Sequence, residues 1–227
     1  MKIHIKFNGA GGHYSYLVGI ASVLQDNFNL DNVIFSGYSA GCVPALLCSL
    51  DINIQNEFRY INIPTLKELN SYKTKSFFNF IPTLKKYILL RLNYISPNLY
   101  KKANNRMYCN LTRIPQIKTD IFKEYYSNED LVECLMASGH IPFYNNSLFY
   151  KFRNNYYFDG GLNTDEHFLN FEHITLPIST TMYRKNLLSN FLFISTDLDY
   201  SIYLYNLGRE DMLKNLTYYK QYLPLKK

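Results

Sequence analysis

A serine flanked by glycines is the feature of this sequence best suited to covalent chemistry. Residues 37–41 read Gly-Tyr-Ser-Ala-Gly, which matches the pattern GxSxG with Ser39 at its centre. The apolar residues 32–36 precede the motif and the small, apolar residues 42–50 follow it, which predicts a strand, a sharp turn and a helix. A serine on such a turn presents its hydroxyl group as a nucleophile. An ordinary turn with a buried serine has the same pattern, so both interpretations stay open at this point.

A run of small residues near the amino terminus is the second candidate. The run consists of Gly9, Ala10, Gly11 and Gly12. It follows residues 3–7, whose alternation of charged and apolar residues predicts a strand. Its N–H groups could bind a phosphate or an oxyanion; alternatively, its glycines could only allow close packing of the helix and strand. Dinucleotide and P-loop motifs are incomplete here, whereas an oxyanion hole needs only about two N–H groups. Because turns after neighbouring parallel strands emerge at one edge of a sheet, we expect this run beside Ser39.

A serine nucleophile needs a base, and the sequence offers histidines and one well-placed aspartate. Each of the five histidines fits an ordinary structural role; His4, for example, is expected to point outward from a strand. Asp159 ends a short predicted strand and precedes Gly160 and Gly161, although Asp-Gly-Gly alone is most often a turn. Only 38 residues precede Ser39, which is too little chain for the strands that come before the nucleophile of an α/β-hydrolase. The Ser-His-Asp triad of that class is therefore disfavoured.

Three motifs, taken in order, resemble the patatin-like phospholipase family. They are the glycine-rich loop at 8–14, the GxSxG motif at 37–41 and Asp-Gly-Gly at 159–161. Residues 129–142 are also similar to the stretch that precedes the catalytic aspartate in that family. The resemblance covers nearly the whole chain, from Phe7 to Leu216, and three motifs in order are far more specific than any one of them.

The resemblance implies a serine hydrolase that works without a histidine. Ser39 would attack an acyl ester, Asp159 would accept its proton, and the glycine loop would hold the oxyanion before water hydrolyses the acyl-enzyme. The glycines that support the two turns are Gly37, Gly41, Gly160 and Gly161. Phospholipids or neutral glycerolipids are the implied substrates, and neither a metal nor an organic cofactor is implied. The alternatives are a general carboxylesterase or transacylase, and a pseudoenzyme on the same fold that only binds lipid or nucleic acid.

The chain departs from the family pattern in two loops. His13 and Tyr14 stand where the family usually has Arg or Lys followed by Gly, and Asp165 and His167 stand where Asn and Pro are common. The first change reduces positive charge and backbone freedom in the glycine loop. Both changes leave the dyad whole, but they predict low activity or an unusual substrate.

Alternating strands and helices predict an α/β fold in a single domain, residues 1–227. The resemblance implies a three-layer patatin-like fold with a central, mostly parallel sheet flanked by helices. Further helices are expected over residues 16–28, from Pro82 onward, from the N-cap Ser127 to Gly139, and over 210–222. Further strands are expected at residues 106–113, 116–122, 156–158, 174–178 and 191–194.

The positive charge of the chain lies in one segment. The net charge is +6, but residues 66–126 hold 12 basic and 3 acidic residues, an excess of +9. Residues of about 55–105 are also rich in aromatics and are expected to form a variable cap over the acyl pocket. This mixture fits a peripheral contact with an anionic membrane through Lys85, Lys86 and Arg91, or a solvated cap. Single-stranded nucleic acid is the less favoured partner.

Composition narrows the class of protein. With 227 residues, 47% hydrophobic and 19% charged, the chain is expected to be globular, and disordered or disulfide-rich classes are excluded. No apolar run reaches the roughly 20 residues of a membrane-spanning helix, and no signal peptide is expected. Cysteines without a CxxC pair indicate free thiols in a reducing compartment; they are Cys42, Cys48, Cys109 and Cys134. We therefore expect a cytoplasmic protein, free or peripheral on membranes.

Overall fold

The computed structural model describes residues 2–72, 79–142, 147–163, 173–184, 187 and 195–226. The strands are β1 (Lys2–Phe7), β2 (Val33–Tyr38), β3 (Met107–Ile114), β4 (Lys118–Phe122), β5 (Tyr150–Phe152), β6 (Asn155–Phe158) and β7 (His173–Ile178). The helices are α1 (Tyr14–Asn27), α2 (Cys42–Ser49), α3 (Ile54–Glu57), α4 (Ile63–Ser71), α5 (Phe80–Ile95), α6 (Tyr100–Ala103), α7 (Asn128–Ser138), α8 (Leu198–Lys214) and α9 (Leu216–Tyr219). Short 3-10 turns at Gly11–His13 and Ser39–Gly41 and a π-helical turn at Phe58–Asn62 complete the elements.

The strands form one sheet in the order β5-β6-β3-β2-β1-β7, with β4 also paired to β3. The central strands β3, β2, β1 and β7 run parallel, whereas β4, β5 and β6 extend the sheet by antiparallel pairing. The predicted fold class is therefore confirmed: the chain is an α/β protein with a central, mostly parallel sheet flanked by helices.

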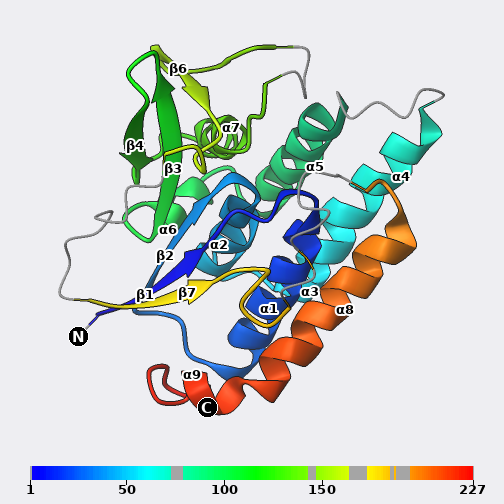
Figure 1. Ribbon diagram of the computed structural model, residues 1–227, viewed down its shortest axis with the longest axis vertical. Helices are drawn as coiled ribbons and strands as arrows, with labels where there is room; N and C mark the ends of the chain where they lie inside the picture. Colours follow the sequence, from blue (N-terminus) through cyan, green and yellow to red (C-terminus); the bar gives the residue numbers. More distant parts are fainter. Residues whose placement is uncertain are drawn as a thin grey trace.

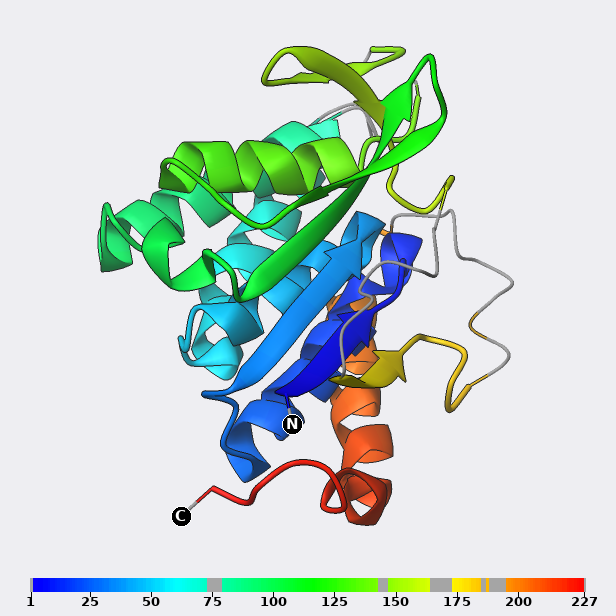
Figure 2. The ribbon, with the colours of Figure 1, turned by 90° about the vertical axis from the view of Figure 1, so that its left-hand side faces the viewer.

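The described helices lie against one face of this sheet. Helix α1 connects β1 to β2, and helices α2 to α6 connect β2 to β3, so both connections step in the same direction. Because such connections are right-handed, their helices must share a face. Figure 1 shows the sheet, α1 and α8 following one another across the molecule, and in Figure 2 the strands lie in front of the helices. A helical layer on the opposite face, as the predicted three-layer arrangement requires, is not found among the described residues.

Helix α8 fixes α1, which carries the glycine loop at its start. The two helices pack along each other, and the Tyr16 hydroxyl group donates a 2.9 Å hydrogen bond to Asp211. Arg184 donates two further hydrogen bonds to the same carboxylate, at 2.7 and 2.9 Å. Charge-assisted, bidentate bonds of this kind are geometrically specific. The carboxyl-terminal part of the chain therefore holds the first helix, and with it the preceding loop, in place.

Two expectations about local structure were wrong. His4 does not point outward: it is buried, and its ring nitrogens lie 2.7 Å from Ser36 Oγ and 3.2 Å from Thr175 Oγ1. Strand β1 is a central strand of the parallel part of the sheet, and such strands are usually buried on both faces, so alternation does not mark a solvent face there. The helix expected over 210–222 begins twelve residues earlier, where Asp197 caps α8 through its side chain, and it stops at Lys214 before the short α9.

The other expected elements are confirmed within a few residues, including the side-chain N-cap of Ser127 on α7. Strand β5, which has only three residues, was not among the expected elements. The strand expected at 191–194 lies outside the described residues. All four cysteines are buried free thiols, as expected. None of the helices in the described ranges is both long and apolar enough to cross a membrane.

Candidate active site

The GxSxG motif and the glycine loop lie side by side at one edge of the sheet. Strands β1 and β2 pair in parallel, with Phe7 opposite Gly37, so the turns that follow them emerge together. A Cβ atom built on Gly9 would lie 3.4 Å from the Ser39 Cβ, and Gly11 and Ser39 line the same cavities. The predicted juxtaposition of the loop and the serine is therefore confirmed.

Ser39 occupies a backbone conformation that is unfavourable for a residue with a side chain. Its φ angle is +54°, and the left-handed region costs a non-glycine residue roughly 1–2 kcal/mol. The flanking glycines permit this turn, because a Cβ on Gly37 would lie 2.6 Å from the Gly41 carbonyl oxygen and one on Gly41 would lie 2.4 Å from that of Phe7. The turn thus has the strained strand-to-helix geometry that presents a serine hydroxyl group at a sheet edge.

The backbone around Asp159 is held by two other parts of the chain, strand β3 and the end of α7. The Asp159 N–H donates to the His140 carbonyl at 2.8 Å, the Thr112 hydroxyl group donates to the Asp159 carbonyl at 2.8 Å, and the Gly160 N–H donates to the Ser138 carbonyl at 2.9 Å. Strand β6, which ends directly before Asp159, pairs with β3. The position of this carboxylate is therefore set by the sheet and by the end of α7.

Asp159 is half-buried, and only one of its two carboxylate oxygens accepts a hydrogen bond. Oδ1 accepts the Gly161 N–H at 2.7 Å, whereas Oδ2 is buried without a hydrogen-bond partner among the described residues. Burial raises the pKa of Asp159 to about 6, and the nearby Ser39 hydroxyl group and the Gly161 N–H partly offset this rise. The structure thus places the Ser39 hydroxyl group close enough to the Asp159 carboxylate to affect its pKa.

Ser138 connects three segments of the site, a role that was not predicted from the sequence. Its fully buried hydroxyl group accepts the Ser39 N–H at 2.9 Å and donates to the Asn110 carbonyl at 2.6 Å. Its own carbonyl oxygen receives the Gly160 N–H. One residue therefore connects the serine turn, the β3 strand and the turn after Asp159. Its place at the end of an apolar helix, just before a glycine, was the available signal.

Two cavities meet at Ser39. The first, of about 60 Å³, has an almost wholly apolar wall formed by Gly11, Tyr14, Ala40, Cys42, Val43, Phe80, Ile81, Leu84, Leu135, Met136, Gly139 and Ile141. The second, of about 360 Å³, is lined by Gly9, Gly11, Tyr38, Ile141, Pro142, Asp159, Gly161 and Leu162. The size of the second cavity lies within the usual range of small-molecule sites. Ser39 therefore stands between an apolar cavity and a wider one that contains the aspartate.

Neither cavity is lined by a histidine in the part of the chain that is described. His13, in the glycine loop, is buried, and burial lowers its pKa, so that it adds no positive charge to the loop near neutral pH. Its neighbour Tyr14 lines the apolar cavity. Asp165 and His167 lie outside the described residues. No group of three metal-ligating side chains occurs within the described ranges.

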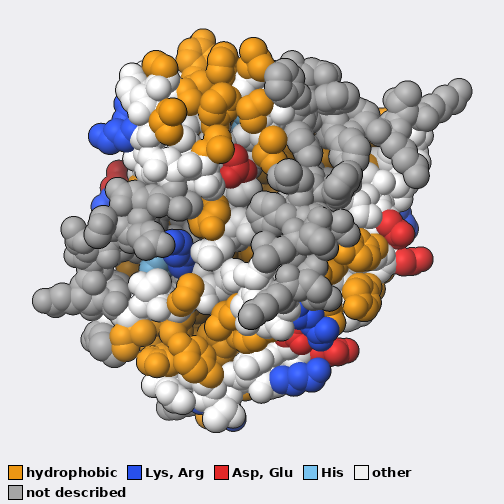
Figure 3. Space-filling view, viewed as in Figure 1, with side chains coloured by type: hydrophobic (Ala, Val, Ile, Leu, Met, Phe, Trp, Pro, Cys, Tyr) orange, Lys and Arg blue, Asp and Glu red, His pale blue; other side chains and the backbone are white. Residues whose placement is uncertain are grey.

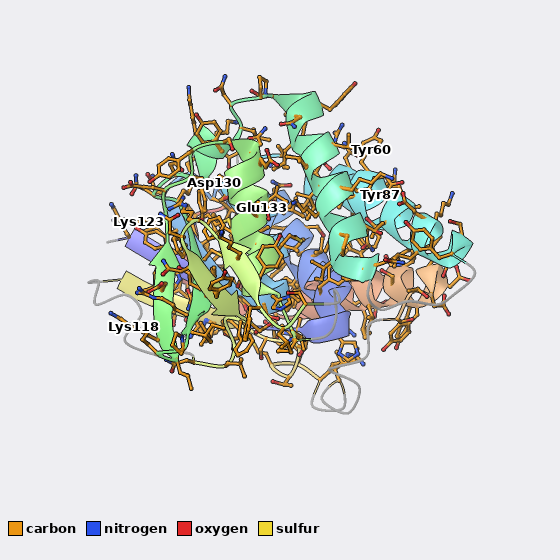
Figure 4. All side chains as sticks on the ribbon, turned by 90° about the horizontal axis from the view of Figure 1, so that it is seen from above. Tyr60, Tyr87, Lys118, Lys123, Asp130 and Glu133 are labelled. Carbon is orange, nitrogen blue, oxygen red and sulfur yellow. The ribbon has the colours of Figure 1, made fainter. Side chains whose placement is uncertain are left out.

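The expected basic cap contributes to the apolar cavity through α5, which supplies Phe80, Ile81 and Leu84. The charges on the same helix are compensated, however. Figure 4 shows Glu133 between α7 and α5, where it pairs with Lys85. Glu68 pairs with Lys86 at 2.6 Å, and Glu57 pairs with Arg91 at 2.7 Å. The contact of these three cations with an anionic membrane stays a prediction, and their pairing removes the free charge on which it was based.

Comparisons with known proteins point to one group of enzymes. No family model matches the chain. Curated relatives include mouse omega-hydroxyceramide transacylase (29% identity, 69% of this chain, 26% of the relative) and human patatin-like phospholipase domain-containing protein 4 (25%, 70% and 64%). Mouse 1-acylglycerol-3-phosphate O-acyltransferase Pnpla3 is 26% identical over 70% of this chain and 39% of its own length. The chain thus spans less than two thirds of each of these relatives.

Two solved structures are similar at 12% sequence identity. VipD from Legionella pneumophila has a TM-score of 0.44, with 83% of this chain and 52% of that chain covered. The ExoU-SpcU complex of Pseudomonas aeruginosa has a TM-score of 0.46, with 99% of this chain and 53% of that chain covered.

The raised pKa of Asp159 should make the free energy of unfolding depend on pH. The folded-state pKa of Asp159, about 6, lies above the value near 3.9 expected in the unfolded chain. Between about pH 4 and 6 the unfolded state therefore loses this proton first, so the contribution of Asp159 to the free energy of unfolding falls as the pH rises. Asp159→Asn should gain stability relative to the wild type through this window, by about 3 kcal/mol above pH 6.

Urea unfolding at several pH values measures this difference. Exposed Asp31 provides the control, because Asp31→Asn removes a carboxylate without removing a buried one. A lost hydrogen bond in Asp159→Asn gives only a constant offset. A difference between wild type and Asp159→Asn that stays constant from pH 4 to 7 would show that the carboxylate is not desolvated.

Proposed function

Since the chain is related to the patatin-like phospholipase domain proteins, we propose that it is a serine hydrolase that cleaves acyl esters of phospholipids or glycerolipids. The observation that carries this proposal is the placement of Ser39, on a strained turn between an apolar cavity and the Asp159 carboxylate, whose Oδ2 atom is buried. A hydroxyl nucleophile, a basic group and a site for an acyl chain are the parts that such a reaction needs.

In the proposed reaction the Ser39 Oγ attacks the carbonyl carbon of the ester while Oδ2 of Asp159 takes the hydroxyl proton. The carbonyl oxygen becomes an oxyanion, which N–H groups of the Gly9–Gly12 loop stabilise. Collapse of the intermediate expels the alcohol, which takes the proton from Asp159, and leaves an acyl group on Ser39. Water, deprotonated by Asp159, then hydrolyses this ester and regenerates the serine.

Desolvation makes an aspartate suitable for this role. An ordinary carboxylate is a weak base at neutral pH, and burial makes Asp159 more basic by raising its pKa to about 6. A group with this pKa is still ionised at pH 7, so it can accept a proton without first losing one. The unpartnered Oδ2 atom has a free acceptor site for the proton.

The apolar cavity is the proposed site for the acyl chain. Its wall includes Tyr14, Val43 and Leu84, and the same three residues line a further cavity of about 10 Å³. This further cavity extends from the apolar cavity toward α1 and the π-helical turn, past Val18 and Phe58. We propose that Tyr14, the largest of the shared side chains, ends the acyl site and restricts it to shorter chains.

Acyl transfer is the second candidate function. Two of the relatives are named as a transacylase and an acyltransferase, and the same acyl-enzyme would then pass its acyl group to an alcohol instead of water. Analysis of the products in the presence of an added alcohol separates the two functions. A new ester indicates transfer, and free fatty acid alone indicates hydrolysis.

Replacement of the nucleophile tests the proposed function. Ser39→Ala should reduce hydrolysis of a medium-chain acyl ester by at least about a thousandfold, because no other group can form the acyl-enzyme. Asp159→Asn should reduce it by about a hundredfold or more, since the base is lost. Ser71→Ala, at the exposed end of α4, is the matched control and should keep full activity. A wild type as inactive as Ser39→Ala would leave only a binding role for the fold.

Replacing Tyr14 with a smaller residue tests whether it limits the length of the acyl site. Tyr14→Val should join the two apolar cavities, so the ratio of kcat/KM for a long-chain ester to that for a short-chain ester should rise about tenfold. Tyr14→Phe keeps the ring and should keep the wild-type ratio. Steady-state kinetics with a series of esters provide the measurement. An unchanged ratio in a folded Tyr14→Val variant would place the acyl chain elsewhere.

A further inference from the structure

Large apolar side chains are exposed together on the antiparallel part of the sheet. Figure 3 shows hydrophobic side chains gathered at the end of the molecule where Figure 1 places β3, β4 and β6. We call the following six residues the apolar platform, because they line one open groove of about 600 Å³: Ile114, Pro115, Ile117, Phe149, Tyr156 and Phe158. Ile117 is 65% exposed, Tyr156 50% and Phe149 44%. Exposed apolar residues grouped in this way typically mark an interaction site.

The strand register places these side chains on one face. Tyr156 of β6 lies directly opposite Ile114 of β3, and Phe158 lies two residues further along the same strand. Residues opposite one another in an antiparallel pair share a face, as do alternate residues of one strand. Phe149, just before β5, contacts both aromatic rings, with centroid distances of 6.2 Å to Tyr156 and 5.6 Å to Phe158. The platform is therefore one continuous surface.

One cation borders the platform on its own face. Lys151 of β5 lies opposite Tyr156 and so shares its face. Its side chain is exposed and forms no ion pair with any described residue. Lys118 directly follows Ile117, but it lies opposite Arg113, which in turn lies opposite Tyr157, so it belongs to the other face of the sheet. The border of the platform thus carries a free positive charge, unlike helix α5.

The platform adjoins the mouth of the candidate active site. Phe158 is followed directly by Asp159, and the 62% exposed Leu162 lines the wider cavity together with that aspartate. Asn163 links this segment to the platform, because its side chain donates a 2.8 Å hydrogen bond to the Ile117 carbonyl. The exposed apolar surface and the entrance to Ser39 therefore form one continuous region.

We propose that the apolar platform docks on the surface of a lipid bilayer that contains anionic lipids. Aliphatic and aromatic side chains enter the boundary between headgroups and acyl chains, while Lys151 contacts anionic headgroups. A bilayer is favoured over a protein partner because the platform leads into a site that would take an acyl lipid. This inference rests on the proposed function for its substrate, but the docking itself is measured without catalysis.

Vesicle binding tests the docking directly. The double variant Ile117→Ser and Phe149→Ser should bind vesicles of phosphatidylcholine and phosphatidylserine at least about tenfold more weakly than the wild type, measured by flotation. Leu90→Ser with Tyr94→Ser removes two exposed apolar side chains from α5 (58% and 81% exposed) and should bind as the wild type does. Lys151→Glu should reduce the preference for phosphatidylserine. Undiminished binding by the platform variant would overturn the proposal.

A soluble substrate separates this proposal from the proposed function. The platform variant should keep wild-type hydrolysis of a soluble short-chain ester and lose at least about tenfold of its rate on vesicle lipid. If the wild type binds vesicles through the platform but hydrolyses neither substrate, the proposed function fails and the docking stands. If the platform variant instead abolishes a dimer seen by size-exclusion chromatography and leaves vesicle binding unchanged, a second copy of the chain covers this surface and the docking proposal fails.

Discussion

The parallel pairing of β1 with β2 is the constraint on which the site depends. It makes the glycine loop and the Ser39 turn emerge at the same edge of the sheet, and it brings their backbones so close that a side chain at Gly41 would collide with the end of β1. The positive φ angle of Ser39 is tolerated because this packing leaves the turn no relaxed alternative. The other elements complete this arrangement: α8 holds α1 in place, and Ser138 holds the Ser39 backbone.

Burial of the Asp159 Oδ2 atom makes this carboxylate more basic. The chain brings Asp159 to the serine from an antiparallel strand that is distant in sequence, and it leaves one carboxylate oxygen without a partner. Such a group costs stability and gains basicity for the same reason, which is the loss of hydration of its charged form. Function and instability are therefore two consequences of one placement.

The sequence was sufficient for the parts of the site that depend on short motifs. The glycines around Ser39 and after Asp159 have patterns that fix local geometry, and the order of strands and helices places them at one sheet edge. Ser138 could not be found in this way, because its role depends on hydrogen bonds to Ser39 and Asn110, which are remote in sequence. The same limit explains His4, because alternation on β1 does not reveal that its ring lies beside the Ser36 and Thr175 hydroxyl groups, which come from remote strands.

Charge was the property that the sequence described least well. The basic excess of residues 66–126 suggested a membrane surface on α5, but glutamates from α3, α4 and α7 pair with the cations of that helix. Composition counts charges without showing their partners. The apolar residues of the platform come from the end of β3, the turn between β3 and β4, the loop before β5, and strand β6. Only the folded sheet therefore reveals them as one surface.

The most direct test of the account is the pH dependence of the rate at which a fluorophosphonate labels Ser39. If Asp159 is the base, the labelling rate constant of the wild type rises with pH, reaches half its maximum near pH 6 and becomes constant at higher pH. The Asp159→Asn variant is then labelled at least about a hundredfold more slowly at pH 7. Labelling of Asp159→Asn at the wild-type rate, with the same pH profile, would contradict the account.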